Sequence, residues 1–137
     1  MVSIPFESIY IQANPTTTLD IKRKIEASSK TIVLDNPRGA HAILEIINAV
    51  NKKVILSVSG TGRVREYQLQ YSILFRVTDQ KGRVIVPVTK IKINQVLPFS
   101  DSAFLSSQME EEMLRKEMQR NAILRLMNAL GKAKSLD

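Results

Sequence analysis

The residues of this chain best suited to chemistry are basic side chains around a predicted hairpin. Arg63 and Arg65 follow the turn Ser59-Gly-Thr-Gly62, and Lys52 and Lys53 lie on the segment before it. Across a hairpin these groups can gather at one end or along one edge of a sheet. Arginine grips phosphate through paired hydrogen bonds, so the pattern indicates an anion site. The alternative is that these residues are scattered over a solvated surface, with the lysines on a sheet edge where they prevent pairing with another chain. This is the commoner outcome for any single residue.

Groups for catalysis or metal binding are sparse. The chain has no cysteine and one histidine, His41, which lacks a second histidine or carboxylate cluster at ligand spacing. No serine lies in a Gly-x-Ser-x-Gly setting, and the glutamates at 110–112 suit the start of a helix. The turn at 59–62 leads into a predicted strand, whereas a phosphate-binding loop leads into a helix. The sequence therefore predicts no catalytic residue, no metal and no cofactor.

The net charge favours an anionic partner. The chain carries 20 Lys and Arg against 13 Asp and Glu, and the excess lies before residue 101. Nucleic acid, acidic lipid head groups and an acidic protein all fit such a charge. However, Tyr67, Tyr71 and Phe75 share a strand face typical of a core, and the terminal helix begins acidic. We therefore expect no nucleic-acid partner.

Hydrophobic periodicity predicts four main strands that position these residues. Residues 7–12 alternate apolar and polar side chains, and residues 42–58 are rich in Ile, Val and Leu. Residues 67–77 carry apolar side chains at strict two-residue steps, and residues 84–97 alternate isoleucine with lysine. The last three segments form an antiparallel meander, and 42–58 is one bulged strand or two strands. Thr31–Leu34 is a candidate for one more short strand.

Two helices are predicted, one after the first strand and one at the end of the chain. The first begins at a capping box formed by Thr17 and Asp20 and ends near residues 28–30. The second runs from a capping box at Ser107-Gln-Met-Glu110 to a C-cap at Gly131. Its apolar residues recur at four-residue steps, and its four methionines are assigned to the core.

The order of these elements predicts an α+β fold with a single domain over residues 1–137. It is a two-layer sandwich in which two helices pack on one face of a mixed, mostly antiparallel four-stranded sheet. No apolar run approaches the roughly 20 residues that a membrane-spanning helix needs.

Several runs of the sequence resemble the LptE (RlpB) family of lipopolysaccharide-assembly lipoproteins. The resemblance covers nearly the whole chain and rests on the sum and order of the runs. It implies a non-enzymatic outer-membrane lipoprotein on the periplasmic side that plugs the LptD β-barrel and contacts lipopolysaccharide. The runs are Ile4–Ile11, Ala42–Ile46, Arg65–Tyr71, Asp79–Gly82 and residues 111–118.

The resemblance also implies where lipopolysaccharide binds. In the family, basic positions associated with this ligand lie near the hairpin and at the start of the terminal helix. Here the helix start offers only the polar residues 106–108. The candidate residues are therefore Arg63 and Arg65, followed by Lys52 and Lys53.

Members of the family are anchored through an acylated cysteine that follows a signal peptide. This chain has no cysteine and opens Met1-Val-Ser-Ile-Pro-Phe6, without a basic and apolar signal region. The expectation is therefore the folded part of such a lipoprotein, without signal peptide or anchor. The competing hypothesis is a basic module that binds nucleic acid or another anion in the cytoplasm.

Overall fold

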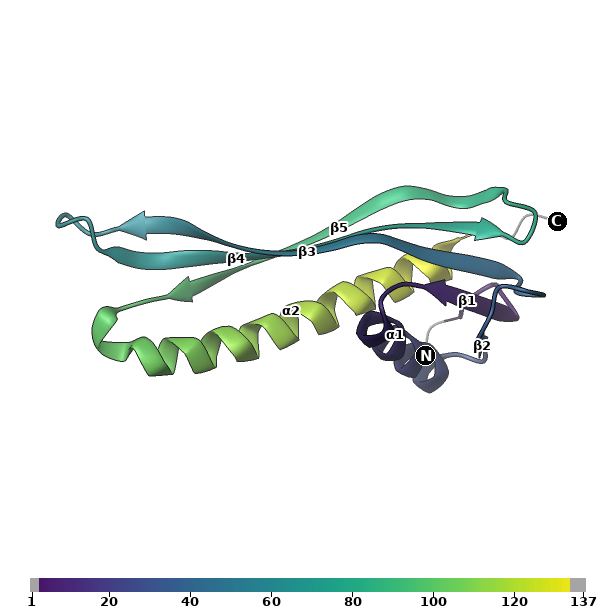
Figure 1. Ribbon diagram of the computed structural model, residues 1–137, viewed down its shortest axis with the longest axis horizontal. Helices are drawn as coiled ribbons and strands as arrows, with labels where there is room; N and C mark the ends of the chain where they lie inside the picture. Colours follow the sequence, from purple (N-terminus) through teal and green to yellow (C-terminus); the bar gives the residue numbers. More distant parts are fainter. Residues whose placement is uncertain (1–2, 134–137) are drawn as a thin grey trace.

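The computed structural model describes residues 3–133, which form a mixed sheet with helices on one side (Figure 1). This confirms the predicted α+β two-layer class. The described elements are β1 (Ser8–Gln12), α1 (Pro15–Ser28), β2 (Ile32–Leu34), β3 (Ala42–Val58), β4 (Val64–Asp79), β5 (Val84–Pro98), the short 3₁₀ turn η1 (Asp101–Ala103) and α2 (Phe104–Lys132).

The sheet has five strands in the order β2-β1-β3-β4-β5, so the predicted number of four is wrong. The additional strand is β2, which confirms the candidate strand at residues 31–34 and pairs in parallel with β1. Strand β1 also runs parallel to β3 but covers only Ala42–Glu45. Within the described chain, the rest of β3 is therefore an outer edge of the sheet, and β3, β4 and β5 form the predicted antiparallel meander.

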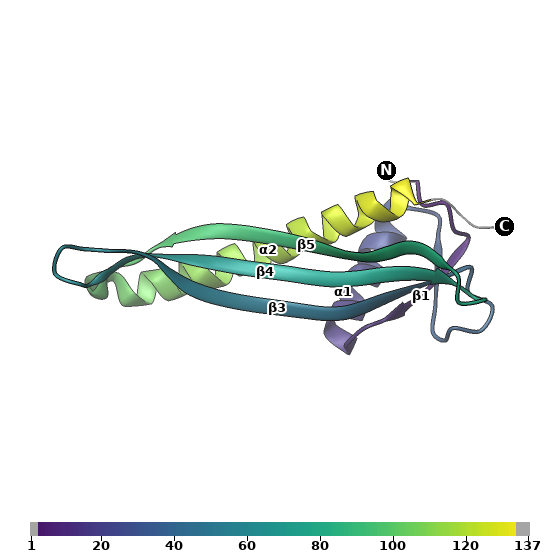
Figure 2. The same cartoon turned by 90° about the horizontal axis from the view of Figure 1, so that it is seen from above.

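Segment 42–58 is one continuous strand with irregularities, which was one of the two alternatives. Its pairing with β4 shifts between Ile46 and Asn48 and again around Ser57. A bulge of this kind keeps the strand paired while increasing its twist. Figure 2 shows the long, twisted ribbon that β3, β4 and β5 form together.

The core lies between the helices and one face of the sheet, with β4 contributing a continuous row of buried residues. The odd-numbered residues of β4 from Leu69 to Val77 are buried, as the two-residue periodicity predicts, while Tyr67 is half-buried. Helix α2 packs mainly against β5 and β4, and α1 packs beside β1 and β2 (Figure 1). The buried helical residues are Ile21 and Ile25 of α1, and Ser107, Met118, Ala122, Leu126, Met127 and Leu130 of α2.

The predicted cap of the first helix is wrong by one turn. Asn14 is the N-cap, and its Oδ1 accepts a hydrogen bond of 2.8 Å from the backbone N–H of Thr17. Pro15 occupies the first helical position, where its fixed φ is already helical. Asparagine followed by proline therefore starts the helix before Thr17 can act as the cap.

Both predicted ends of the terminal helix are also wrong. The chain enters α2 through η1, so the helix starts at Phe104, and Ser107 is buried within its first turns. At the other end Gly131 stays helical, and Ala133 is the C-cap. The packing of Leu130 in the core holds this last turn in place beyond the predicted glycine stop.

A polar cluster ties the first half of α2 to the edge strand β3. Lys53 Nζ lies 2.7 Å from Glu111 Oε1 and 4.4 Å from the centre of the Tyr67 ring. Arg115 donates to Glu111 Oε2 at 3.0 Å and to Asn51 Oδ1 at 3.3 Å. Burial opposes ionisation of Glu111, but the hydrogen bonds and charges of Lys53 and Arg115 outweigh it, so its pKa is lowered.

Replacing Leu126 by alanine should destabilise the fold, because this side chain is 0% exposed between α2 and the sheet. We expect a loss of about 2–5 kcal/mol in the free energy of unfolding, measured by urea titration. The matched control is Leu124→Ala on the same helix, where the side chain is 43% exposed. Equal losses in both variants would contradict the described packing of α2.

Glu111→Gln should weaken the attachment of α2 to β3 in a pH-dependent way. A lowered pKa means that ionised Glu111 stabilises the folded state above its ordinary pKa of 4.5, and that this contribution is lost as the pH falls through the lowered value. Wild type should therefore be more stable than the variant near neutral pH, and the gap should close in acid. The exposed neighbour Glu112→Gln is the control; a gap that widens in acid would refute the assignment.

Candidate anion-binding surfaces

The turn between β3 and β4 fixes the position of Arg63. Ser59 Oγ accepts from the backbone N–H of Arg63 at 3.2 Å, and the N–H of Ser59 donates to the Arg63 carbonyl at 2.7 Å. Gly62 closes the turn with a φ of +80°, a conformation that favours glycine. The turn therefore projects Arg63 towards the segment that leads into α2.

Arg63 and Arg65 border one shallow hollow of about 600 Å³, which we call the hairpin end. Arg63 NH1 is 2.8 Å from Asp101 Oδ2, but both side chains are mostly exposed, at 74% and 64%, so this pair is weak. Within the described chain no ion pair engages Arg65, and its carbonyl accepts from the N–H of Phe99 at 2.9 Å. The hollow is lined by Ser59, Arg63, Val64, Arg65, Phe99, Ser100, Asp101 and Ser102.

The two predicted lysines point to opposite faces of the sheet. Lys53 pairs with Leu69, whose side chain faces the helices, and Lys52 pairs with Gln70, whose side chain faces away from them. Lys53 is held by Glu111, whereas Lys52 is exposed. The structure therefore brings Arg63 and Arg65 together, but the four predicted residues do not share one site.

Exposed apolar side chains surround the hairpin end. Val58 is exposed just before the turn, and Phe104 and Leu105 are exposed where α2 begins. Met109 and Met113 continue this strip along α2, being 67% and 54% exposed. Their assignment to the core is therefore wrong, since α2 leans on β4 and β5 through its other face, and only Met118 and Met127 are buried.

A second group of cations was not proposed from the sequence. On the sheet face opposite the helices, Lys90 and Lys92 of β5 pair with Leu74 and Ser72 of β4. Their two-residue spacing predicts a shared face, but only the pairing register brings that face beside Lys52. Lys52 and Lys90 border one shallow depression together with Asn48, Val50, Ser72 and Leu74.

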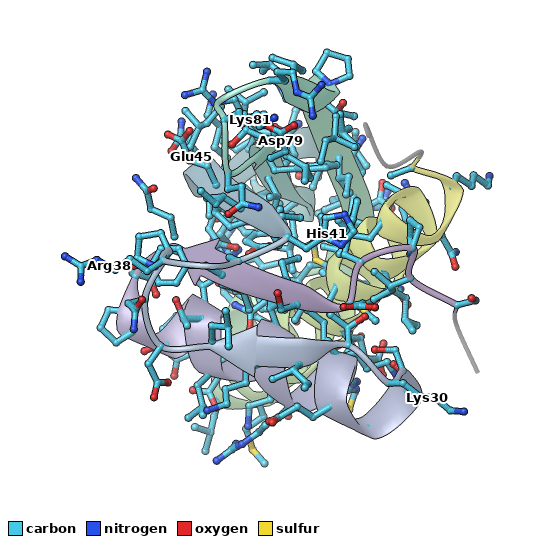
Figure 3. All side chains as sticks on the ribbon, turned by 90° about the vertical axis from the view of Figure 1, so that its right-hand side faces the viewer. Lys30, Arg38, His41, Glu45, Asp79 and Lys81 are labelled. Carbon is cyan, nitrogen blue, oxygen red and sulfur yellow. The ribbon has the colours of Figure 1, made fainter. Side chains whose placement is uncertain are left out.

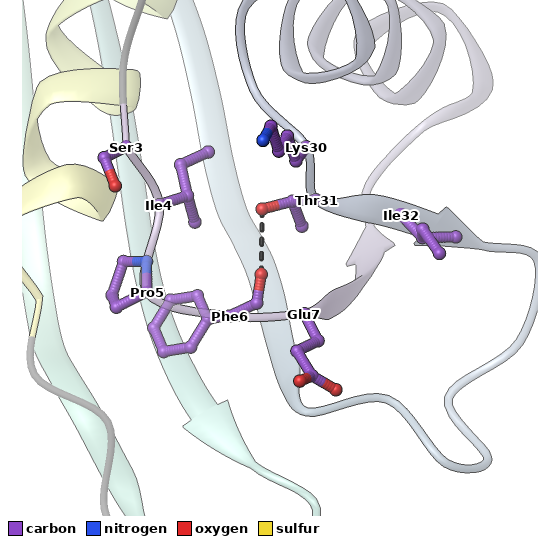
Figure 4. A pocket seen from close by; sticks show the side chains of 8 residues that line it. All are labelled: Ser3, Ile4, Pro5, Phe6, Glu7, Lys30, Thr31 and Ile32. Atoms are coloured by element: carbon purple, nitrogen blue, oxygen red, sulfur yellow. Dashed lines mark hydrogen bonds between the residues drawn. The ribbon is translucent and has the colours of Figure 1, made fainter.

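The opposite end of the molecule holds a larger, mainly apolar hollow of about 770 Å³ (Figure 4). Within it Thr31 Oγ1 donates to the carbonyl of Phe6 at 2.8 Å. His41 lies at this end too, where its Nδ1 accepts from the N–H of Glu7 at 3.3 Å and its ring packs edge-on against Phe6 (Figure 3). The contacts of Thr31 and His41 join the segment before β1 to the segments that lead into β2 and β3.

Among residues 3–133, no three histidine or acidic side chains lie close enough together to hold a metal ion. No helix in this part of the chain has the length and apolarity needed to cross a membrane.

Solved structures resemble this chain closely in fold. The uncharacterized lipoprotein B from Nitrosomonas europaea is 35% identical with a TM-score of 0.84, over 91% of this chain and 82% of that one. The rare lipoprotein B from Shewanella oneidensis is 21% identical with a TM-score of 0.76, over 90% and 92% of the two chains. A minor lipoprotein from Acinetobacter baumannii is 9% identical with the same score of 0.76, over 98% of each chain. The last two show the fold alone.

No protein with a curated description matches the chain significantly. The sequence pattern of the family described as "LptE: Lipopolysaccharide-assembly" matches residues 6–130, which is most of the chain. Together with the Nitrosomonas lipoprotein, this match shows that the chain belongs to the LptE family of lipopolysaccharide-assembly lipoproteins.

Proposed function

We propose that this protein is a non-enzymatic, single-domain partner of the LptD β-barrel at the outer membrane. It is held on the periplasmic side by an N-terminal lipid, occupies the barrel lumen and contacts lipopolysaccharide. Family membership supports this proposal most directly. The observation that carries the ligand contact is the pair Arg63 and Arg65 at one hollow, surrounded by exposed apolar side chains.

The hairpin end matches the chemistry of lipopolysaccharide. That ligand combines phosphate groups with acyl chains, so a binding surface needs cations beside apolar side chains. Arg65 has no ion-pair partner within residues 3–133, and the pair between Arg63 and Asp101 is exposed enough to open for a stronger anion. Phe104 and Leu105 supply exposed apolar surface next to these arginines.

The shape of the molecule supports a position inside a barrel. The part that carries the hairpin end is narrow, being only the three-stranded ribbon and the first half of α2 (Figures 1 and 2). The edge strand β3 exposes Val54, Ile55 and Leu56 there. Apolar side chains exposed on a narrow projection are typical of a surface that another protein covers.

The hypothesis of a cytoplasmic module that binds nucleic acid has less support. Base recognition on a sheet needs exposed aromatic side chains, but Tyr71 and Phe75 are buried. Tyr67 packs edge-on against Phe99 with a centroid distance of 5.3 Å. The family match also gives this alternative no support.

Replacing Arg63 and Arg65 together by alanine should weaken binding to micelles that contain lipid A about five- to tenfold, because two exposed phosphate contacts are lost. The variant should unfold at the same urea concentration as wild type. The measurement is a titration followed by fluorescence anisotropy of the labelled protein.

The control removes the same charge from the opposite end, with Arg38→Ala and Lys81→Ala; both side chains are exposed there (Figure 3). This variant should bind within about twofold of wild type, since exposed charges at such a distance are screened. If both double variants lose binding equally, net charge explains the effect and the hairpin end is not the contact site.

A further inference from the structure

The sheet has one face that nothing in the described chain covers. Both helices lie on the same side, and Figure 2 looks onto the opposite side, which we call the open face. The even-numbered residues of β4 from Gln68 to Arg76 face this side, together with their partners on β3 and β5. In the middle of the open face these are Asn48, Val50, Lys52 and Val54 of β3 and Lys90, Lys92, Asn94 and Val96 of β5.

Three lysines of the open face surround Ser72. On β5, Lys92 pairs with Ser72 and Lys90 pairs with Leu74. On β3, Lys52 pairs with Gln70, which lies two residues before Ser72. Strand spacings put the Cα atoms of Lys52 and Lys92 about 12 Å apart and those of Lys90 and Lys92 about 7 Å apart. Lysine side chains are long and flexible enough to reach inwards from these positions, so all three can contact one ligand above Ser72.

Among residues 3–133 these lysines have no acidic partner, whereas the acidic residues of this face do have partners. None of the ion pairs in the described chain involves Lys52, Lys90 or Lys92. Glu45 is instead paired with Arg76 at 2.7 Å, and Glu66 accepts from Ser57 Oγ at 2.7 Å. The centre of the open face is therefore a patch of uncompensated positive charge, which attracts anions.

The floor between the lysines is partly apolar. Val50 and Leu74 line the depression that Lys52 and Lys90 border, and Val54 and Val96 lie exposed beside it. Every aromatic residue of β4 is at an odd position and faces the helices, so this floor offers no ring on which a base can stack. Cations around an aliphatic floor suit a phosphorylated amphiphile better than a nucleic acid.

We propose that the open face is a second binding surface, formed by Lys52, Lys90 and Lys92 around Ser72, for the phosphorylated head group of an anionic glycolipid. This inference rests on the proposed function, which supplies such a ligand, but it assigns a surface separate from the hairpin end.

The test replaces the three lysines together, as Lys52→Gln, Lys90→Gln and Lys92→Gln. The probe is phosphatidylcholine vesicles that contain a minor fraction of lipid A, with pure phosphatidylcholine vesicles as reference. We expect the apparent affinity to fall about tenfold or more, because each lysine near an anionic lipid surface contributes to binding. Dephosphorylated lipid A should bind wild type and variant alike.

The matched control removes three exposed lysines elsewhere, as Lys30→Gln, Lys81→Gln and Lys116→Gln. It should stay within about threefold of wild type. Equal losses in the two triple variants, or no loss in the open-face variant, would overturn the inference. Displacement of the vesicles by millimolar inorganic phosphate alone would also overturn it, since the site would then be one for the free anion.

A local probe separates this inference from the proposed function. The chain has no cysteine, so Ser72→Cys provides one labelling site for a polarity-sensitive fluorophore, and Ala27→Cys on α1 provides the control. Lipid A vesicles should change the emission at position 72 and leave that at 27 unchanged. If the Arg63 and Arg65 variant loses binding while the label at 72 stays silent, the proposed function stands and the open face is refuted. If wild type binds no lipid A, the open face and the lipopolysaccharide contact at the hairpin end are both refuted, while the barrel partnership is tested separately.

Discussion

The alternation of side chains along β4 is the constraint on which the rest of this structure depends. Its odd-numbered residues from Leu69 to Val77 are buried beneath α2, so its even-numbered residues must face the other side. Paired residues of neighbouring strands face the same side of a sheet, so the pairing of β4 with β3 and β5 extends these two faces across the meander. A shift of one residue would exchange the core for the cationic surface, and the same register therefore determines both the core and the proposed binding surface.

The molecule divides along its length into a closed part and an open part. Helix α1 and strands β1 and β2 close one end, where Phe6, Ile9 and Ile25 are buried. The other end consists of the hairpin and the beginning of α2, joined to each other by the polar contacts of Glu111. Arg63 and Arg65 lie in this second part, together with the exposed side chains of Val58, Phe104 and Leu105.

Sequence periodicity predicted the parts of the fold that repeat along one strand or helix. The two-residue steps from Tyr67 to Val77 gave the core face of β4, and turn residues gave the meander. The helix ends depended on contacts outside the local pattern: Pro15 after Asn14 begins α1 early, and η1 leads into α2 before Ser107. Strand β2 is only three residues long, so its local pattern made it only a candidate, and its pairing with β1 makes it a strand of the sheet.

The candidate site was predictable to the same extent. Arg63 and Arg65 lie together because both follow the same turn. Lys52 and Lys53 are consecutive residues of one strand, so their side chains face opposite sides of the sheet. The grouping of Lys52 with Lys90 and Lys92 required the register across three strands, including its irregularities.

The central claim is that this protein works inside the LptD barrel, and affinity capture of the lipid-anchored protein from detergent-solubilised outer membranes tests it most directly. Recovery of an LptD barrel in near-equal amount, identified by mass spectrometry, is the predicted result. Recovery of nucleic acid or ribosomal proteins without any barrel would contradict the claim.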